Sequence, residues 1–269
     1  MAGNFICTTC GVQTAASATP PERCLICDDE RQYPARHGLE WTTGEELRET
    51  HRNRMTEIEP NLFGIGTDPP FAIGQRALLV CTAHGNVLWD CISLLDDQTV
   101  GRIADLGGID TIAISHPHFY ASMVDWATVF DARILLHAAD REWVMRPDPR
   151  IQYWDEDQRD VNPEVRLIHA GGHFPGSTVC HWRSGAGGAG VLLTGDTIHV
   201  VADRRWVSFM HSVPNLVPLP ASKVDRIVRT VEPLEFDRLY GGWWDYCVPD
   251  DARERVRMSA KRYIDALKD

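Results

Sequence analysis

The sequence predicts an α/β protein organised around one main domain, and three observations support this expectation. Short apolar runs typical of buried strands alternate with segments whose apolar residues recur at helical spacing. Several of these apolar runs lead directly into a histidine or an aspartate. The length of 269 residues, with 43% hydrophobic and 24% charged residues, suits a globular protein with a substantial core.

The charge balance and the lack of long apolar segments narrow the class of protein. A formal net charge of -11 does not suit a partner with a phosphate backbone, which requires a dense lysine and arginine surface. Residues 1–30 hold no basic segment followed by an apolar core, and no later segment has about 18 uninterrupted apolar residues. We therefore expect a cytoplasmic protein with no nucleic-acid partner and no membrane span.

Four cysteines near the N-terminus have the spacing of a structural zinc site. They form two CxxC pairs, Cys7 with Cys10 and Cys24 with Cys27. Four thiolates can close a tetrahedral shell around Zn²⁺ and leave no position for a substrate. The alternative, two reduced redox pairs, is disfavoured by the doubled spacing. We predict a zinc-ribbon-like segment over residues 1–40, too small for a core of its own, and a main domain over residues 41–269.

The main domain is expected to begin with a short helix followed by a sheet. Thr42 or Thr43, together with Glu45 and Glu46, resembles a capping box and predicts a helix that runs toward Arg54. Strand-like segments and a hairpin turn follow. The strand-like segments lie near residues 58–65, 77–81 and 87–90, and the turn lies at residues 84–86.

Helices and strands alternate through the rest of the chain. Segments with helical spacing cover residues 97–106, 121–130, 138–145, 221–231 and 250–268. Strand-like segments cover residues 112–114, 134–137, 165–168, 178–182, 191–193 and 236–240. Residues 199–220 show no clean periodicity and predict a long loop of the kind that often covers a site.

Potential metal ligands lie at the ends of these apolar runs. One run leads into His116-Pro117-His118, and both imidazoles would project to one side if this backbone were extended. A third histidine, His173, lies in a glycine-rich loop, and Asp196 follows a later apolar run. Three imidazoles and a carboxylate form a suitable ligand set for Zn²⁺. The sequence therefore predicts a second metal site.

These motifs, in this order, resemble those of the metallo-β-lactamase superfamily. The segments that carry the resemblance are Leu88-Trp89-Asp90, Ser115-His116-Pro117-His118, Gly172-His173-Phe174-Pro175-Gly176-Ser177 and Thr194-Gly195-Asp196-Thr197. The resemblance extends from about residue 58 to residue 242 and leaves out the four-cysteine segment. It implies an αββα sandwich with a metal cleft at one edge of two packed sheets. It also implies His116, His118 and His173 as ligands of the first metal, with Asp196 beside them.

The chain departs from the family pattern where a second metal ion would bind in that cleft. The usual HxHxDH motif has aspartate and histidine at the positions of Tyr120 and Ala121. The family's late glycine-histidine is replaced by Gly241-Gly242-Trp243-Trp244. We therefore expect a mononuclear site, in which one Zn²⁺ would lower the pKa of its bound water to about 7.

Further side chains receive hypothetical roles at this site. Asp196 is either a fourth ligand or the base that accepts a proton from water, and Tyr120 either donates to a developing oxyanion or simply packs. Asp90 is expected to orient a ligand histidine through a hydrogen bond. An aromatic wall would favour an apolar or aromatic substrate. Its candidates are Trp206, Phe209, Trp243 and Trp244.

The expected function is a zinc-dependent hydrolase that uses a metal-bound hydroxide on a small ester, lactone, thioester or amide. One alternative is a mononuclear iron oxygenase of the persulfide-dioxygenase type, although three imidazoles exceed the usual set of two histidines and one carboxylate. Another is a catalytically silent metal-binding protein that serves assembly or sensing. The sequence leaves self-association into a homo-oligomer open.

Overall fold

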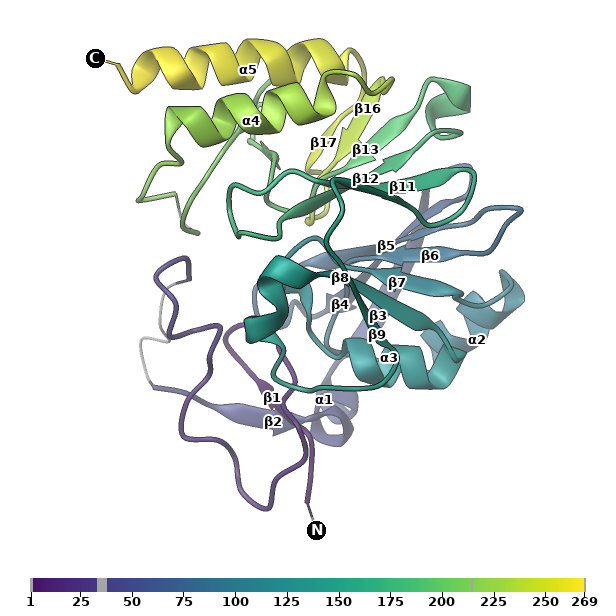
Figure 1. The fold of residues 1–269 in the computed structure, drawn as a ribbon. Coiled ribbons are helices and arrows are strands. Elements are labelled where there is room, and N and C mark those ends of the chain that lie inside the picture. The colour runs from purple at the N-terminus through teal and green to yellow at the C-terminus, as the bar shows by residue number, and fades with distance from the viewer. Residues whose placement is uncertain (1, 33–37, 214, 269) are drawn as a thin grey trace.

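The structure is a computed structural model that describes residues 2–32, 38–213 and 215–268. Its main part has four layers, in which two β-sheets pack face to face and helices lie outside them (Figure 1). One outer layer consists of α4 (Ala221–Val231) and α5 (Ala252–Ala266), and the opposite one contains α2 (Asp97–Asp105) and α3 (Met123–Phe130). This arrangement confirms the predicted αββα sandwich.

The larger sheet has seven strands in the same order as in the chain. They are β3 (Arg52–Glu59), β4 (Leu62–Asp68), β5 (Arg76–Val80), β6 (Val87–Trp89), β7 (Thr111–Ala113), β8 (Arg133–His137) and β9 (Ile151–Trp154). Strands β3 to β6 pair antiparallel, and β6 to β9 pair parallel through α2, α3 and the 3₁₀ helix η2 (Ala138–Trp143). Parallel neighbours require crossover connections, so the predicted alternation of strands and helices is confirmed here.

The second sheet has six strands in the order β10-β11-β12-β13-β16-β17. Their bounds are β10 (Gln158–Asp160), β11 (Val165–His169), β12 (Thr178–Trp182), β13 (Val191–Leu193), β16 (Arg238–Tyr240) and β17 (Cys247–Val248). Strands β13 and β16 are parallel, and the other pairs are antiparallel. The expected loop at 199–220 contains a further small pair, β14 (His199–Val200) and β15 (Val207–Ser208). A short 3₁₀ helix, η3 (Ala186–Gly188), precedes β13.

Buried residues along the strands alternate between the two faces of each sheet. Leu78 packs in the cluster between the sheets, while Leu79 packs in the cluster on the side of α2 and α3. In the second sheet, Leu167 packs between the sheets and Ile168 packs beneath α4 and α5. Each such side chain contributes about 1.5–3 kcal/mol when fully buried. Because side chains alternate between the two faces of each sheet, the two sheets form three apolar layers, one between them and one on each outer face.

The N-terminal segment forms a small sheet that crosses the predicted boundary at residue 40. Strand β1 (Phe5–Cys7) pairs antiparallel with β2 (Trp41–Thr43). The next helix, α1 (Gly44–Thr50), begins with the expected capping box between Thr43 and Glu46. It ends before Arg54, because the chain turns into β3 at Arg52. The four-cysteine segment therefore leads into the main domain through a sheet of its own.

This segment docks on the main domain instead of standing apart from it. The four cysteines belong to the same buried apolar cluster as Leu79 and Trp126. The Gln13 N–H donates to the carbonyl of Ala121 at 3.0 Å, and the Ser93 hydroxyl donates to the carbonyl of Gly11 at 2.7 Å. The segment and the main domain therefore share one core, in agreement with the small size that the segment has by itself.

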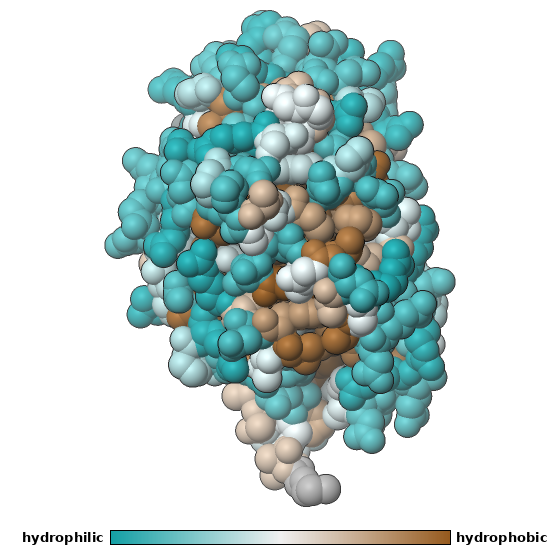
Figure 2. Space-filling model, turned by 90° about the vertical axis from the view of Figure 1, so that its right-hand side faces the viewer, coloured by the Kyte–Doolittle hydropathy of each residue, from teal (hydrophilic) through white to brown (hydrophobic). Residues whose placement is uncertain are grey.

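The surface agrees with the composition. Figure 2 shows a face on which hydrophilic residues predominate at the top and along both sides, while apolar residues gather across the middle. None of the helices within the described residues combines the length and the apolar character that a membrane crossing requires.

Candidate metal centre

Four predicted ligands meet at one edge of the sandwich. His116 follows β7, His118 lies in the 3₁₀ helix η1 (Pro117–Phe119), His173 lies between β11 and β12, and Asp196 follows β13. One possible ligand atom from each lies within 4.8 Å of the others. All four residues are 1% exposed. The structure thus brings together a buried donor set from both sheets.

The distances within this cluster fit a metal ion. The His116 Nε2 atom lies 3.4 Å from Asp196 Oδ2, and His173 Nε2 lies 3.2 Å from His118 Nδ1. Nitrogen ligands at about 2.0–2.1 Å from a tetrahedral Zn²⁺ are roughly 3.4 Å apart. His116 Nε2 and Asp196 Oδ1 are also buried without a hydrogen-bond partner. Buried polar atoms are normally paired, so these orphaned atoms support a metal ligand role.

The backbone conformation of the His116-Pro117-His118 segment differs from the expected one. His116 is extended, with φ -171° and ψ 172°, but Pro117 starts a 3₁₀ turn instead of continuing the strand. Proline suits the first position of a helical turn because it has no N–H to leave unpaired. The imidazole rings of His116 and His118 still approach each other, with centroids 5.1 Å apart. The expectation of extended backbone through the motif was therefore wrong.

A hydrogen-bonded pair of residues supports His116 from behind. The Ser115 Oγ atom lies 2.8 Å from His116 Nδ1, and the Ser115 backbone N–H donates to Asp90 Oδ1 at 2.8 Å. Asp90 therefore acts on the ligand through Ser115 and not directly. Burial raises the pKa of Asp90 to about 7.

The close packing around Ser115 explains the glycine of the Thr194-Gly195-Asp196 motif. Gly195 has φ +52°, and a Cβ atom there would lie 2.3 Å from Ser115 Oγ. Both the backbone conformation and the space require glycine at this position.

The loop that carries His173 is fixed by the side chains of Asp140, from outside the loop, and of Ser177, within it. The Gly176 N–H donates to Asp140 Oδ1 at 2.7 Å, and the Phe174 N–H donates to Ser177 Oγ at 2.7 Å. Burial raises the pKa of Asp140 to about 7 and lowers the pKa of His173 to about 3. The His173 imidazole is therefore neutral near pH 7, as a metal ligand must be.

A cavity of about 490 Å³ opens directly onto the cluster. It is lined by Thr8, Thr9, Gln32, Ala72, Ile73, His118, Asp196, His199, Val213, Trp243 and Tyr246. Sequence reasoning missed His199, whose Nδ1 lies 3.6 Å from Asp196 Oδ1. Its position three residues after Asp196 was the available signal. The threonines between Cys7 and Cys10 were also missed, because their position in the four-cysteine segment suggested a structural role alone.

Tyr120 lies away from this cavity, so its expected role as an oxyanion donor requires correction. The phenol is buried, and its hydroxyl donates to the backbone carbonyl of Asp140 at 3.3 Å. The side chain lines a separate small space together with Val12 and Gln13. The 3₁₀ turn after His116 directs Tyr120 toward the N-terminal segment, and the packing alternative holds.

Three of the four predicted wall aromatics also lie elsewhere. The guanidinium of Arg262 covers Trp206 at 4.8 Å, and Phe209 packs in the core beneath α4 and α5. Trp244 packs over β4, where a Cβ at Gly66 would lie 2.6 Å from its Nε1. Trp243 does line the cavity. The wall is therefore built from Trp243 and Tyr246, beside His199.

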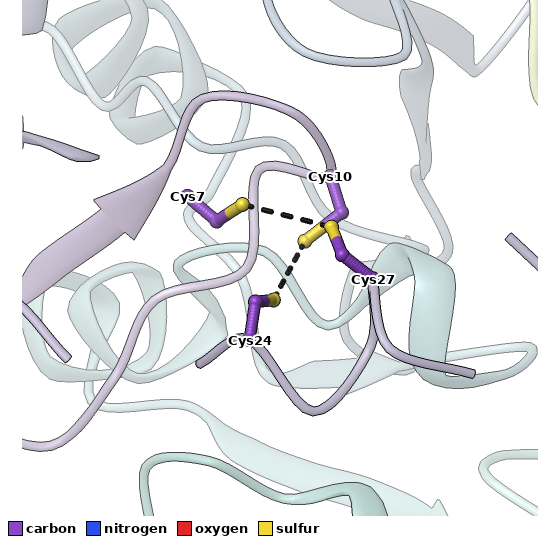
Figure 3. Close-up of side chains that lie close together, drawn as sticks. All are labelled: Cys7, Cys10, Cys24 and Cys27. Carbon is purple, nitrogen blue, oxygen red and sulfur yellow. Dashed lines mark hydrogen bonds between the residues drawn. The ribbon is translucent and has the colours of Figure 1, made fainter. Parts of the chain in front are cut away.

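The four cysteines form a second candidate centre. Figure 3 shows their sulfur atoms turned toward one another from the two CxxC turns. The Sγ atoms of Cys7 and Cys27 are 3.7 Å apart, and those of Cys10 and Cys24 are 3.5 Å apart. A disulfide requires about 2.0 Å, whereas thiolates at about 2.3 Å from a tetrahedral Zn²⁺ are roughly 3.8 Å apart. The cluster therefore fits a closed tetrahedral metal site and not a disulfide.

Comparison with known proteins places this geometry in a family. The profile of the metallo-beta-lactamase superfamily matches residues 72–243. The chain belongs to the metallo-β-lactamase superfamily. It is 50% identical over 265 residues to the uncharacterized protein YmaE of Bacillus subtilis (strain 168), an alignment that covers 98% of this chain and 96% of YmaE.

A more distant relative is the transcription termination factor FttA of Thermococcus kodakarensis. It is 26% identical over 258 residues, which cover 78% of this chain but 37% of FttA. Among solved structures, a HARLDQ-motif mutant of a metallo-β-lactamase from Cronobacter sakazakii has a TM-score of 0.53 at 18% identity, and the match covers 80% of this chain and 95% of the mutant. The DIM-1 metallo-β-lactamase has a TM-score of 0.59 at 11% identity and covers 78% and 97%. These structures share the fold.

Proposed function

We propose that this protein is a zinc-dependent hydrolase that acts on a small, neutral acyl substrate. The observation that carries the proposal is the buried set of four donors at the cavity of about 490 Å³. In the proposal His116, His118, His173 and Asp196 hold one metal ion. A bound Zn²⁺ would supply a Lewis acid and lower the pKa of a coordinated water to about 7.

The protonation states of the donors suit this role. Burial lowers the pKa of His118 well below its usual range, so its imidazole is neutral. Burial opposes ionisation of Asp196, but the neighbouring imidazoles of His116 and His199 outweigh it and hold the pKa of this carboxyl well below its usual value. Asp196 is therefore a carboxylate that can bind a metal or accept a proton at Oδ1.

A single metal ion is the stoichiometry that these side chains favour. Ala121 offers no ligand atom, and the Tyr120 hydroxyl is engaged with the carbonyl of Asp140. Three imidazoles with one carboxylate suit the borderline-soft Zn²⁺ better than the two-histidine, one-carboxylate pattern of non-haem iron. These features support zinc over iron and one ion over two.

The cavity lining supports a small neutral substrate. The described lining residues include no lysine and no arginine that could pair with a phosphate group. Trp243 and Tyr246 offer apolar faces, while Thr9 and Gln32 offer uncharged polar groups. Esters, lactones, thioesters and amides fit this lining better than phosphodiesters. The net charge of -11 likewise argues against nucleic acid as a substrate.

The test combines metal analysis with an activity panel on the full-length protein. We expect hydrolysis of at least one substrate from a set of small esters, lactones, thioesters and amides, and no oxygen uptake with glutathione persulfide. His118→Ala should abolish this hydrolysis, while His84→Ala, at an exposed turn, should retain it. Oxygen uptake lost in His118→Ala, or a protein whose His site binds no metal, would overturn the proposal.

A further inference from the structure

We propose that the four-cysteine segment contributes residues to the active site, in addition to its structural role. In this proposal Arg31 is a positioning residue for His173, and Thr9 is a specificity-determining residue that faces the substrate. The second role rests on the proposed hydrolase function, whereas the first depends only on metal binding.

Arg31 holds the backbone of a metal ligand. Its Nε donates to the carbonyl oxygen of His173 at 2.9 Å. The guanidinium also lies 4.7 Å above the ring of Phe174, the next residue. The contact thus links the end of the four-cysteine segment to a loop 142 residues further along the chain. Such support behind a metal ligand typically changes metal affinity by about 10–100-fold.

Arg31 is itself held in place. Its Nη1 donates to both oxygens of Asp29 at 2.8 Å, and these side chains are 17% and 12% exposed. Its carbonyl accepts a hydrogen bond from the Val213 N–H at 2.8 Å. A preorganised guanidinium loses little conformational freedom when it binds the His173 carbonyl. The ion pair with Asp29 therefore serves to aim Arg31.

The His173 loop needs such support because its glycines allow the backbone many conformations. Gly171 and Gly172 precede the ligand and have φ values of +65° and +95°. Glycine adopts many conformations at little cost, so the loop gains its fixed position from external contacts. Asp140 supplies such a contact at Gly176, and Arg31 supplies one at His173. The ligand is held from both sides.

The same segment forms one wall of the cavity. Thr8 and Thr9 lie between Cys7 and Cys10, and both line the cavity together with His118 and Asp196. The Thr8 N–H donates to the Glu40 carbonyl at 3.0 Å, and its hydroxyl donates to the same atom at 3.2 Å. A metal ion bound by the cysteines would fix this CxxC turn and with it the wall. The shape of the cavity thus depends on the four-cysteine centre.

The positioning role of Arg31 is tested by separate metal affinities for the two centres in the full-length protein. Co²⁺ serves as the probe, because thiolate and imidazole coordination give different absorption spectra. We expect Arg31→Met to weaken Co²⁺ binding at the His site by about 10–100-fold while the four-cysteine site keeps its affinity. Arg31→Lys should restore part of this loss, because an ammonium can still donate to the His173 carbonyl.

A matched control is available in the same segment. Arg23 also pairs with an aspartate, Asp28, at 2.8 Å, but its side chain is 81% exposed. Arg23→Met should leave both affinities unchanged. Unchanged His-site affinity in Arg31→Met would overturn the positioning role. Equal losses at both sites in Arg31→Met and Arg31→Lys would also overturn it, because they would indicate general destabilisation.

The specificity role of Thr9 is tested with two metal-binding probes, acetohydroxamate and benzohydroxamate, on the Co²⁺-loaded protein. Thr9→Phe should weaken benzohydroxamate by about tenfold or more, because the new ring fills space that the probe requires, and should spare acetohydroxamate. Thr19→Phe, at an exposed position in the same segment, should change neither. Equal effects of Thr9→Phe on both probes, or none, would overturn this role. These measurements require no hydrolysis, so failure of the proposed function would be distinguishable.

Discussion

The backbone N–H of Ser115 donates a hydrogen bond of 2.8 Å to the carboxylate of Asp90. This contact joins the end of β6 to the end of β7, and the Ser115 hydroxyl then lies 2.8 Å from His116 Nδ1. A metal ion bound at Nε2 would place the imidazole proton on Nδ1, where the Ser115 oxygen can accept it. A buried carboxylate thus controls the orientation of a ligand that it does not contact.

Removal of the Ser115 hydroxyl should weaken metal binding. Ser115→Ala leaves the His116 Nδ1–H without its partner, so the imidazole loses its preferred tautomer and orientation. We expect the affinity of the His site for Zn²⁺ to fall by about 10–100-fold in competition with a chelator. Ser184→Ala, at an exposed position, should bind as the wild type does. Equal affinities for all three proteins would refute the role given to Ser115.

Gly195→Ala should be far more damaging than the same change at another glycine with a similar backbone. Gly187 has φ +66° with nothing within 4 Å of its Cβ position, whereas a Cβ at Gly195 would lie 2.3 Å from Ser115 Oγ. The conformational cost of about 1–2 kcal/mol applies to both. Chemical denaturation should show a greater loss of unfolding free energy for Gly195→Ala. Equal losses would mean that the Ser115 contact relaxes at no cost.

The pH dependence of stability should change in Asp140→Asn. Burial raises the pKa of Asp140 to about 7, well above its value of about 3.9 in an unfolded chain. Between these values the native state holds a proton that the unfolded state lacks, so the unfolding free energy of the wild type falls as pH rises. Asparagine keeps an acceptor for the Gly176 N–H without titrating. The variant should therefore gain stability relative to the wild type from pH 5 to pH 8.

The measurement for Asp140 is the unfolding free energy of both proteins, obtained by denaturant titration at several pH values with saturating Zn²⁺. The difference between them should grow by at most about 1.4 kcal/mol per pH unit, the value for one proton. A difference that stays constant with pH would show that Asp140 does not titrate in this range.

Loss of the four-cysteine metal should destabilise the main domain as well. The four cysteines share a buried cluster with Trp126 of α3, so this segment cannot unfold without exposing part of the core. Cys24→Ser should remove one metal ion per chain and lower the melting temperature of the whole protein. Cys81→Ser, at a half-buried position outside this centre, should retain the metal. A melting temperature unchanged by Cys24→Ser would show that the segment folds independently of the domain.

The fold and the four donors could be predicted because their signals are local. Each signal can be recognised from a few neighbouring residues. The signals are the strand that ends at Ala113, the proline between two histidines and the Thr194-Gly195-Asp196 motif. The capping box at Thr43 is equally local and was correctly identified. By contrast, the helix expected from 138 to 145 is a 3₁₀ helix over Ala138–Trp143, and its backbone leaves helical dihedral angles at Asp140, with φ -108° and ψ 16°.

The cavity could not be predicted, because contacts between distant segments build it. Nothing in the local sequence indicates that Thr9 faces the same space as His199, 190 residues later. The aromatic candidates failed for the same reason, since Trp206 and Trp244 find partners on neighbouring helices and strands. The guanidinium groups of Arg54 and Arg76 lie 4.5 and 5.3 Å from the centre of the Trp244 ring. These contacts hold Trp244 away from the cavity.

The central claim is that one metal ion binds among His116, His118, His173 and Asp196 and a second among the four cysteines. Anomalous diffraction from a crystal of the full-length protein, measured on both sides of the zinc edge and at the iron edge, tests it most directly. We predict two zinc peaks per chain, one between His118 Nδ1 and His173 Nε2 and one within the cysteine sulfurs. A single peak at the cysteines, two peaks within the histidine cluster, or an iron signal there would contradict the account.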